Sequence, residues 1–491
     1  MNRMRSRYAV ALLLVPMAFF SPIRGQDQPT KEKKADEKPA EKWLVDRAVA
    51  VTKASAPVPA LKYRLFPASM ERKDGNAIPI YLRFAHERSD AAKKRLQEKP
   101  AEWNKLPLEK LPLADVKEYL RGYSYNLHQL ELGARRKSAD WNYTLDAGDI
   151  IGLLRPDAQE MRMQAPLLVL KARLEIAEGR YADAIRTLET GFSFSQQVSE
   201  GPFLITSLVG IACANQFAEC LLELMERPDA PNLYWALAVL PRPLVDLRKA
   251  LEFEDQLPEL QFPDLADLAR PRSPEHWDAA LVRVRKEIER ISKNDRDVKP
   301  PKPGTTPADP AAKSPDLPAA RKYLAGVVGL TAANVEAMAP AQVLLLWVSH
   351  YYHEFRDETF KPGYLPFPQA QPLNVAASEQ LKTVPDTEAG RLVRWFLPAI
   401  SRVQLAQVRI ERKLAALRTI EALRMHAAAH GGELPEKIDQ VKIVPAPNDP
   451  GTGKPFEYRR DGQTTTITSL IPGEPLESTG MRYRVTVRKA P

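Results

Sequence analysis

The sequence has few cysteines, and their spacing argues against a disulfide within the chain. Only two of the 491 residues are cysteine, Cys213 and Cys220, and both fall on one predicted helix. At about 1.5 Å per residue their Cα atoms lie roughly 10 Å apart, beyond the reach of a disulfide. We expect both to be buried apolar residues, and an intermolecular bridge is the less favoured alternative.

Glycine and long apolar runs are also scarce. The chain has 22 glycines against 44 prolines, which favours helices separated by stiff turns over a barrel. After residue 25 we find no apolar segment of the roughly 20 residues that a spanning helix needs, so no membrane span is expected there. The hydrophobic fraction of 44% excludes wholesale disorder. The length predicts two or three domains.

The first 25 residues are typical of a secretory signal. Arginines precede an apolar run over residues 9–20, and Gly25 ends a cleavage-site pattern. An uncleaved anchor is the alternative. Cleavage would remove four arginines and no acid, which lowers the formal charge from +9 to +5. We therefore expect a soluble periplasmic or otherwise extracytoplasmic protein with no nucleic-acid partner. Residues 26–42 are charged and predicted to form a disordered tether.

Residues 43–385 are predicted to form a helical domain with two helix hairpins at 157–255. Residues 77–87, 113–137 and 274–294 are further helices, and the Pro-rich residues 296–318 are an exposed linker or insertion. The hairpins rest on apolar residues at helical spacing: Leu167, Leu170 and Leu174; Tyr181, Ala184, Ile185 and Leu188; and Phe217, Cys220, Leu221 and Leu224. The pattern Gly179-x-Tyr181-x-x-Ala184-Ile185 resembles the turn and second helix of a tetratricopeptide repeat (TPR). Only Ala172 matches the first helix, so the array is TPR-like.

Residues 386–491 are predicted to be a small α+β module. A helix over 398–429 ends at Gly431-Gly432, and three alternating stretches near 456–458, 464–470 and 482–488 predict an antiparallel sheet. The sheet would cover the apolar helix face with Ile467, Val485 and Val487. That face consists of Val403, Ile410, Leu414, Leu417 and Leu423. The fold class is therefore mainly α, a helical-hairpin array followed by this module.

Two histidine patterns have the spacing of metal ligands. Helical geometry places His350 and Glu354 on one face with His353 adjacent, but the pattern is not a known zinc motif. We expect these histidines to contact aromatic neighbours. His426 and His430 lie in the last helical turn, where the exposed carbonyls favour a partly positive imidazole. We predict no metal site and no cofactor.

Three other patterns are weak. Gly191-x-Ser193-x-Ser195 lacks the last glycine of a nucleophile elbow, and Gly451-Thr-Gly-Lys454-Pro455 lacks the Ser or Thr of a phosphate loop. A stripe of basic residues follows the last helix and is expected to be a solvated face, with docking of an anionic polymer or membrane surface as the alternative. The stripe consists of Arg402, Arg409, Arg412, Lys413 and Arg424.

The C-terminal part is similar to the end of a type II secretion pseudopilin. The resemblance rests on Gly432, Leu434-Pro435, Asp449-Pro450, Gly453, Pro455 and Tyr458. The family's apolar N-terminal membrane helix is missing. In that family the loop can hold calcium, which makes Asp449 a candidate ligand, but one carboxylate is too few for tight binding.

Most of the mature chain also resembles uncharacterised exported helical proteins of planctomycete bacteria. The likeness lies in residues 60–65, 170–188, 240–249 and 415–435, and implies a shared architecture and export without a known activity.

No complete catalytic set is present among these motifs. The favoured interpretation is a non-catalytic scaffold or protein-binding module with a protein partner in the cell envelope. The alternatives are a structural partner in a pseudopilin-type envelope assembly and a hydrolase with an unrecognised site. The oligomeric state stays open.

Overall fold

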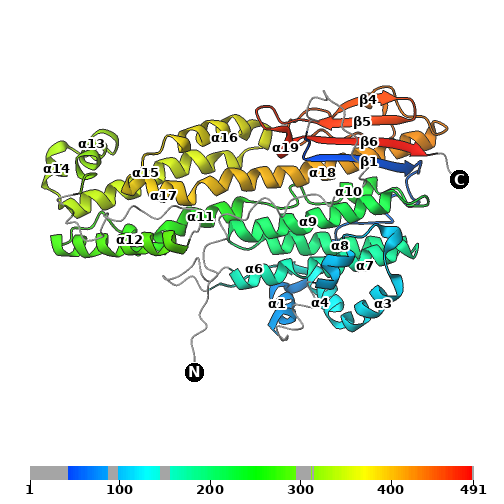
Figure 1. Ribbon diagram of the computed structural model, residues 1–491, viewed down its shortest axis with the longest axis horizontal. Helices are drawn as coiled ribbons and strands as arrows, with labels where there is room; N and C mark the ends of the chain where they lie inside the picture. The colour runs from blue at the N-terminus through cyan, green and yellow to red at the C-terminus, as the bar shows by residue number, and fades with distance from the viewer. Residues whose placement is uncertain (1–41, 87–97, 144–154, 295–310, 312–313, 489–491) are drawn as a thin grey trace, which may run out of the picture.

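Helix α18 (Pro398–Ala429) runs through the middle of the protein and contacts both the helices and the sheet (Figure 1). The computed structural model describes residues 42–86, 98–143, 155–294, 311 and 314–488. The predicted signal peptide and nearly all of the predicted tether lie outside these residues. The bounds of α18 are those predicted, and its predicted apolar face is buried from Val403 to Leu423.

Three consecutive helices form the layer next to α18. They are α7 (Ala165–Ala177), α8 (Tyr181–Ser199) and α9 (Leu204–Met225), and each packs against the others. Gly179 has a φ of +75°, which permits the tight turn between α7 and α8. Gly191 lets α8 approach α9, since a Cβ there would lie 2.6 Å from the ring of Phe217. The predicted helical hairpins are therefore present as helices.

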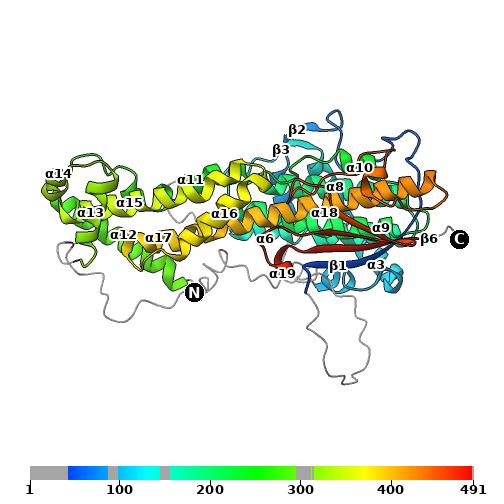
Figure 2. The ribbon, with the colours of Figure 1, turned by 90° about the horizontal axis from the view of Figure 1, so that it is seen from above.

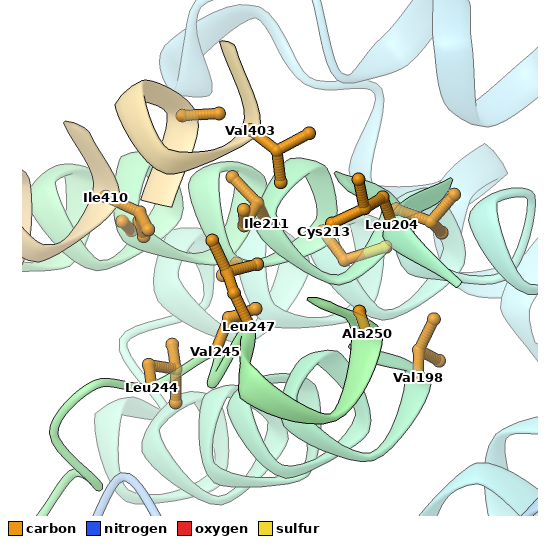
Figure 3. Packing of buried hydrophobic residues seen from close by; sticks show 14 of the residues in the cluster. Val198, Leu204, Ile211, Cys213, Leu244, Val245, Leu247, Ala250, Val403 and Ile410 are labelled. Carbon is orange, nitrogen blue, oxygen red and sulfur yellow. The ribbon is translucent and has the colours of Figure 1, made fainter. Parts of the chain in front are cut away.

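The core between α9 and α18 is apolar. Figure 3 shows Val403 and Ile410 of α18 beside Ile211 of α9, with residues 244–250 below. Cys213 and Cys220 are buried and free, as predicted. Burial raises the pKa of the Cys213 thiol to about 12 and that of Cys220 well above its usual value. Both behave as small apolar side chains.

By length and composition, α9 could also cross a membrane. It continues to Met225, whereas the sequence analysis took its apolar part to be short. In the structure 67% of its most apolar window is buried inside the protein. A buried core helix passes the same test as a spanning one, so α9 is explained by its packing.

The remaining helices extend both ends of the molecule. At the N-terminal side the predicted helix 113–137 is two helices that meet at Tyr123, and its last residues form strand β3 paired in parallel with β2. The elements on this side are β2 (Lys73–Asn76), α1 (Ile78–His86), η2 (Leu108–Lys110), α3 (Leu113–Gly122), α4 (Ser124–Ala134), β3 (Arg136–Ser138) and α6 (Arg155–Arg162). Helices α10 (Tyr234–Ala238) and α11 (Arg248–Gln261) follow α9 in the chain, and they pack against α18 and α9, respectively.

A second group of helices extends away from the sheet to the opposite end of the molecule, and its helix over residues 367–382 lies beside the sheet (Figures 1 and 2). It contains η3 (Pro263–Leu265), α12 (Pro274–Asn294), α13 (Leu317–Val327), α14 (Ala332–Ala337), α15 (Pro340–Phe360), η5 (Lys361–Tyr364), α16 (Phe367–Lys382) and α17 (Glu388–Phe396). Most of the predicted linker 296–318 lies outside the described residues. In its described part Pro315 and Pro318 are exposed as predicted, whereas Ser314 and Leu317 are buried and Leu317 begins α13.

The sheet has the order β1-β6-β5-β4. The three predicted strands are present as β4 (Glu457–Asp461), β5 (Thr464–Ser469) and β6 (Met481–Arg488), and they are antiparallel. The sheet as a whole is mixed, because β1 (Val45–Thr52) pairs in parallel with β6. The predicted module 386–491 therefore lacks one strand of its own sheet. Two short elements, η6 (Ile438–Gln440) and α19 (Leu476–Thr479), lie in its loops.

Candidate functional site

A buried ion pair joins α18 to the loop that precedes β4. Arg412 Nε lies 3.1 Å from Asp449 Oδ1, and the two side chains are 0% and 1% exposed. The guanidinium also donates to the Thr479 carbonyl at 2.6 Å and to the hydroxyl of Ser469. Ser469 in turn donates to the second oxygen of Asp449. One arginine therefore holds together the helix, the loop, the end of β5 and the turn before β6.

The sequence of the loop explains how it closes around this pair. The Asp449 carbonyl accepts from Gly453 N at 2.8 Å, and the Asp449 carboxylate accepts from Gly451 N at 2.8 Å. Gly453 has a φ of +70°, and a Cβ at Gly451 would lie 2.7 Å from Arg412 Cδ. The backbone donors are thus used within the loop. Asp449, the candidate calcium ligand, is instead the partner of Arg412.

A crevice of about 320 Å³ lies beside this network, between α16 and the sheet. Gln371 of α16 bridges it by donating to the Pro472 carbonyl at 2.7 Å. The crevice is lined by prolines, by Phe456 and Leu470, and by Lys454 and Glu457. Asp449 and Ser469 also line it, but both already have internal partners. The Ser469 hydroxyl is buried, and the Asp449 carboxylate that accepts its hydrogen bond is already paired with Arg412, which makes that carboxylate a poor base for activating the serine.

The residues of the predicted histidine cluster on α15 form hydrogen bonds to two different neighbouring helices. His353 Nε2 lies 2.6 Å from Glu259 Oε1 of α11. Glu354 accepts from the Tyr323 hydroxyl of α13 at 2.5 Å. Burial, with a smaller effect of His353, lowers the pKa of His350. Among the described residues no group of three or more His, Cys, Asp or Glu side chains is arranged to hold a metal ion.

The second histidine pair lies at the end of α18. His430 Nδ1 lies 2.8 Å from the His426 carbonyl, which is the helix-end contact expected there. The expectation of a partly positive His426 is wrong. Its side chain is buried, and desolvation lowers its pKa, with further lowering by His430 and Arg460.

The predicted solvated stripe on α18 is also wrong. Arg402 is exposed, but Arg424 is fully buried and pairs with Glu421 at 2.8 Å. Arg424 also donates to the carbonyls of Thr52 and Ala230 at 2.8 and 2.7 Å. Lys413 pairs with Glu219 of α9 at 2.8 Å. Because α18 is covered by helices and by the sheet, Arg412, Lys413 and Arg424 bind carboxylates and backbone carbonyls inside the protein and are unavailable to an anionic polymer.

The serines of the nucleophile-like pattern are internal to α8. Ser193 donates to the Ala134 carbonyl at 2.6 Å and Ser195 to the Gly191 carbonyl at 2.8 Å. Both side chains are buried. They stabilise helix packing and do not form a catalytic pair.

Comparisons with protein-family models, curated proteins and solved structures find no match for this chain. Its functional interpretation therefore rests on the contacts described above.

A half-buried carboxylate on α11 makes stability depend on pH. Glu254 accepts from Leu204 N at 3.2 Å, at the start of α9, and burial raises its pKa from 4.5 to about 7. The native state thus keeps a proton that the unfolded chain releases. Stability due to this group is greatest below pH 4.5 and is lost as the pH rises to about 7.

We expect Glu254→Gln to remove this loss. Its stability relative to wild type should rise between pH 4.5 and 7 and reach a gain of about 1–2 kcal/mol, allowing for solvent screening of a half-buried group. Urea unfolding at several pH values would measure it. Glu252→Gln, at an exposed position of the same helix, should follow the wild-type profile. If the free energies of unfolding of E254Q and wild type changed with pH in parallel, Glu254 would not be the source of the pH dependence.

Proposed function

We propose that the protein is a non-catalytic, extracytoplasmic scaffold that binds a polypeptide partner through the surface formed by η5, α16 and the crevice. The observation that carries this proposal is the exposure of apolar side chains along α16. Only Ala370 and Ala377 are buried in this 16-residue helix. Leu373 and Val375 remain 38% and 41% exposed.

Neighbouring segments extend the apolar surface. Tyr364 and Leu365 precede α16 and are also exposed, and the exposed Leu470 lies across the crevice. Figure 2 shows α16 beside α18. Val375 follows Gln371 by one helical turn and therefore lies on the crevice side of α16, whereas Leu373 lies on the other side of the helix. Exposed apolar groups next to a proline-lined crevice favour burial against another protein.

The polar groups around this surface support binding over catalysis. Asp449 is held by Arg412, and Gln371 by the Pro472 carbonyl. Neither presents a free acid, base or nucleophile to a substrate. A partner would therefore gain affinity chiefly by covering apolar area.

Site-directed photocrosslinking in the producing cell tests the proposal. A photoreactive phenylalanine analogue at Val375, on the crevice side of α16, should give a discrete crosslink to one envelope protein. The matched control is Leu132 on α4, which is 39% exposed and belongs to a different part of the chain. Leu470→Glu should reduce the crosslink from position 375 without changing the melting temperature. Equal crosslinking from positions 132 and 375, or none from 375, would contradict the proposal.

A second candidate is a structural role in a pseudopilin-type assembly. It is supported by α18 lying against a sheet that contains the predicted antiparallel strands, and by the anchored Asp449-Pro450 loop. A crosslinked partner with the sequence of a pilin-like protein would favour this role over a general scaffold.

A further inference from the structure

The two histidines at the end of α18 form a stacked pair. Their ring centroids are 3.9 Å apart and the ring planes differ by 13°. His430 is exposed, whereas His426 is 6% exposed and its Nδ1 has no hydrogen-bond partner among the described residues. Because a carbonyl only accepts, His430 Nδ1 must carry a proton to bond with the His426 carbonyl. The buried imidazole of His426 thus has no hydrogen-bond partner for its Nδ1 among the described residues.

Strand β4 holds the chain segment that follows this pair. Tyr458 donates to the Pro435 carbonyl at 2.6 Å, and Arg460 donates to the Leu434 carbonyl. Arg460 also pairs with Glu436 at 2.9 Å. Leu434 is buried beneath these contacts. Strand β4 therefore holds residues 434–436, which follow the histidine pair in the chain, and its Arg460 lies near enough to act on His426.

We propose that the His426–His430 pair is an acid-sensitive latch, in which protonation of His426 releases residues 431–436 from strand β4. The neutral imidazole of His426 is buried and stacked on His430. The imidazolium would be a buried cation next to a stacked histidine and the Arg460 guanidinium, and it would favour an open state in which water can solvate it.

The surrounding charges give little compensation for the imidazolium. On β4 the nearby charge is Arg460, whose partner Glu436 is mostly exposed. The inward residues of β5 and β6 near this end are uncharged: Thr465, Ile467, Val485 and Val487. Helix α10 has no charged residue. The acids of α9 are engaged elsewhere: Glu219 by Lys413, Glu223 by Arg173 and Glu226 by the Ala50 N–H.

The direction of the effect follows from linkage. Desolvation, then His430 and Arg460, lower the pKa of His426 below its ordinary value of 6.5. The unfolded or open segment therefore binds the proton more readily than the closed one. The neutral His426 therefore contributes its full stabilisation of the closed segment above pH 6.5. This stabilisation is lost as the pH falls from 6.5 through the lowered pKa of His426.

The first test is an NMR titration of the full chain labelled with ¹³C at histidine, with His426→Gln and His430→Gln used for assignment. In wild type the His426 signal should titrate below pH 6.5. His430→Gln should shift that midpoint upward, because it removes a neighbour that disfavours the imidazolium. A wild-type midpoint at or above 6.5 would overturn the proposal.

The second test is hydrogen exchange followed by mass spectrometry at pH 7.5 and 5.0, with correction for intrinsic exchange rates. Peptides covering residues 431–436 should lose protection several-fold at pH 5.0, while peptides from α8 keep theirs. His426→Phe, which carries no proton, should abolish the pH dependence. His426→Gln serves the same purpose if the Phe variant does not fold. Equal loss of protection in wild type and the neutral variants, or no loss in wild type, would refute the latch.

Discussion

Replacing Arg412 by leucine should lower the free energy of unfolding by about 3–5 kcal/mol, the usual cost of breaking a buried ion pair. The variant leaves the Asp449 carboxylate 1% exposed and without its cation. It also removes the donor to the Thr479 carbonyl and to Ser469. The loop at Asp449, the end of β5 and the turn before β6 therefore lose the side chain that contacts all three of them. Urea and thermal unfolding followed by circular dichroism would measure the change.

Two controls separate this loss from a general effect of removing charge. Arg402→Leu changes an exposed arginine on the same helix and should stay within about 0.5 kcal/mol of wild type. The double variant Arg412→Leu/Asp449→Asn should recover part of the loss, because it no longer buries an unpaired charge. An R412L variant as stable as R402L would show that the pair does not hold the loop.

Replacing Val49 by aspartate should destabilise the protein by more than about 3 kcal/mol, because it places an unpaired carboxylate between the sheet and the helices. Val49 is 1% exposed and lies opposite Val485 on β6. Circular dichroism during urea unfolding would show the shift, and the soluble yield at 37 °C should fall with it.

The neighbouring residue provides a matched control. Ala48 is exposed on the outer face of β1, opposite Arg484. Ala48→Asp introduces the same side chain one residue away and should change stability by no more than about 0.5 kcal/mol. Equal effects of V49D and A48D would mean that β1 does not pair with β6 in this register, since side chains alternate between the two faces of a strand.

Elements whose signals lie within a few residues of one another were predicted well. The bounds of α12 and α18 agree with the sequence analysis, because apolar residues recur at helical spacing and Gly431-Gly432 ends the second of these helices. Strands β4 to β6 were placed by alternation and by turn residues such as Gly462. Helix α16 was not predicted, because Pro368 and Pro372 lie within it and its buried face is only two alanines.

The candidate site was only partly visible in the sequence. Asp449 was noted, but as a metal ligand, and Arg412 was assigned to a solvated stripe. The one available signal was the position of Arg412 between Ile410 and Leu414, both of which were placed on the buried face. Whether the charge of an arginine at such a position is buried depends on whether a carboxylate and backbone carbonyls face it. For Arg412 these partners come from residues 449 and 479.

The sequence by itself determined the local elements of this protein: mainly helices, a long last helix, and three short antiparallel strands with their turns. Helical periodicity, alternation and turn residues are properties of neighbouring residues, so they can be read along the chain. Tertiary structure alone decided that β1 joins β6 across more than 400 residues, that Arg412 and Arg424 lie in the interior, and that His426 is enclosed. Each depends on which distant segment covers a side chain, because burial and partner geometry, rather than residue type, set the free energy of a charge.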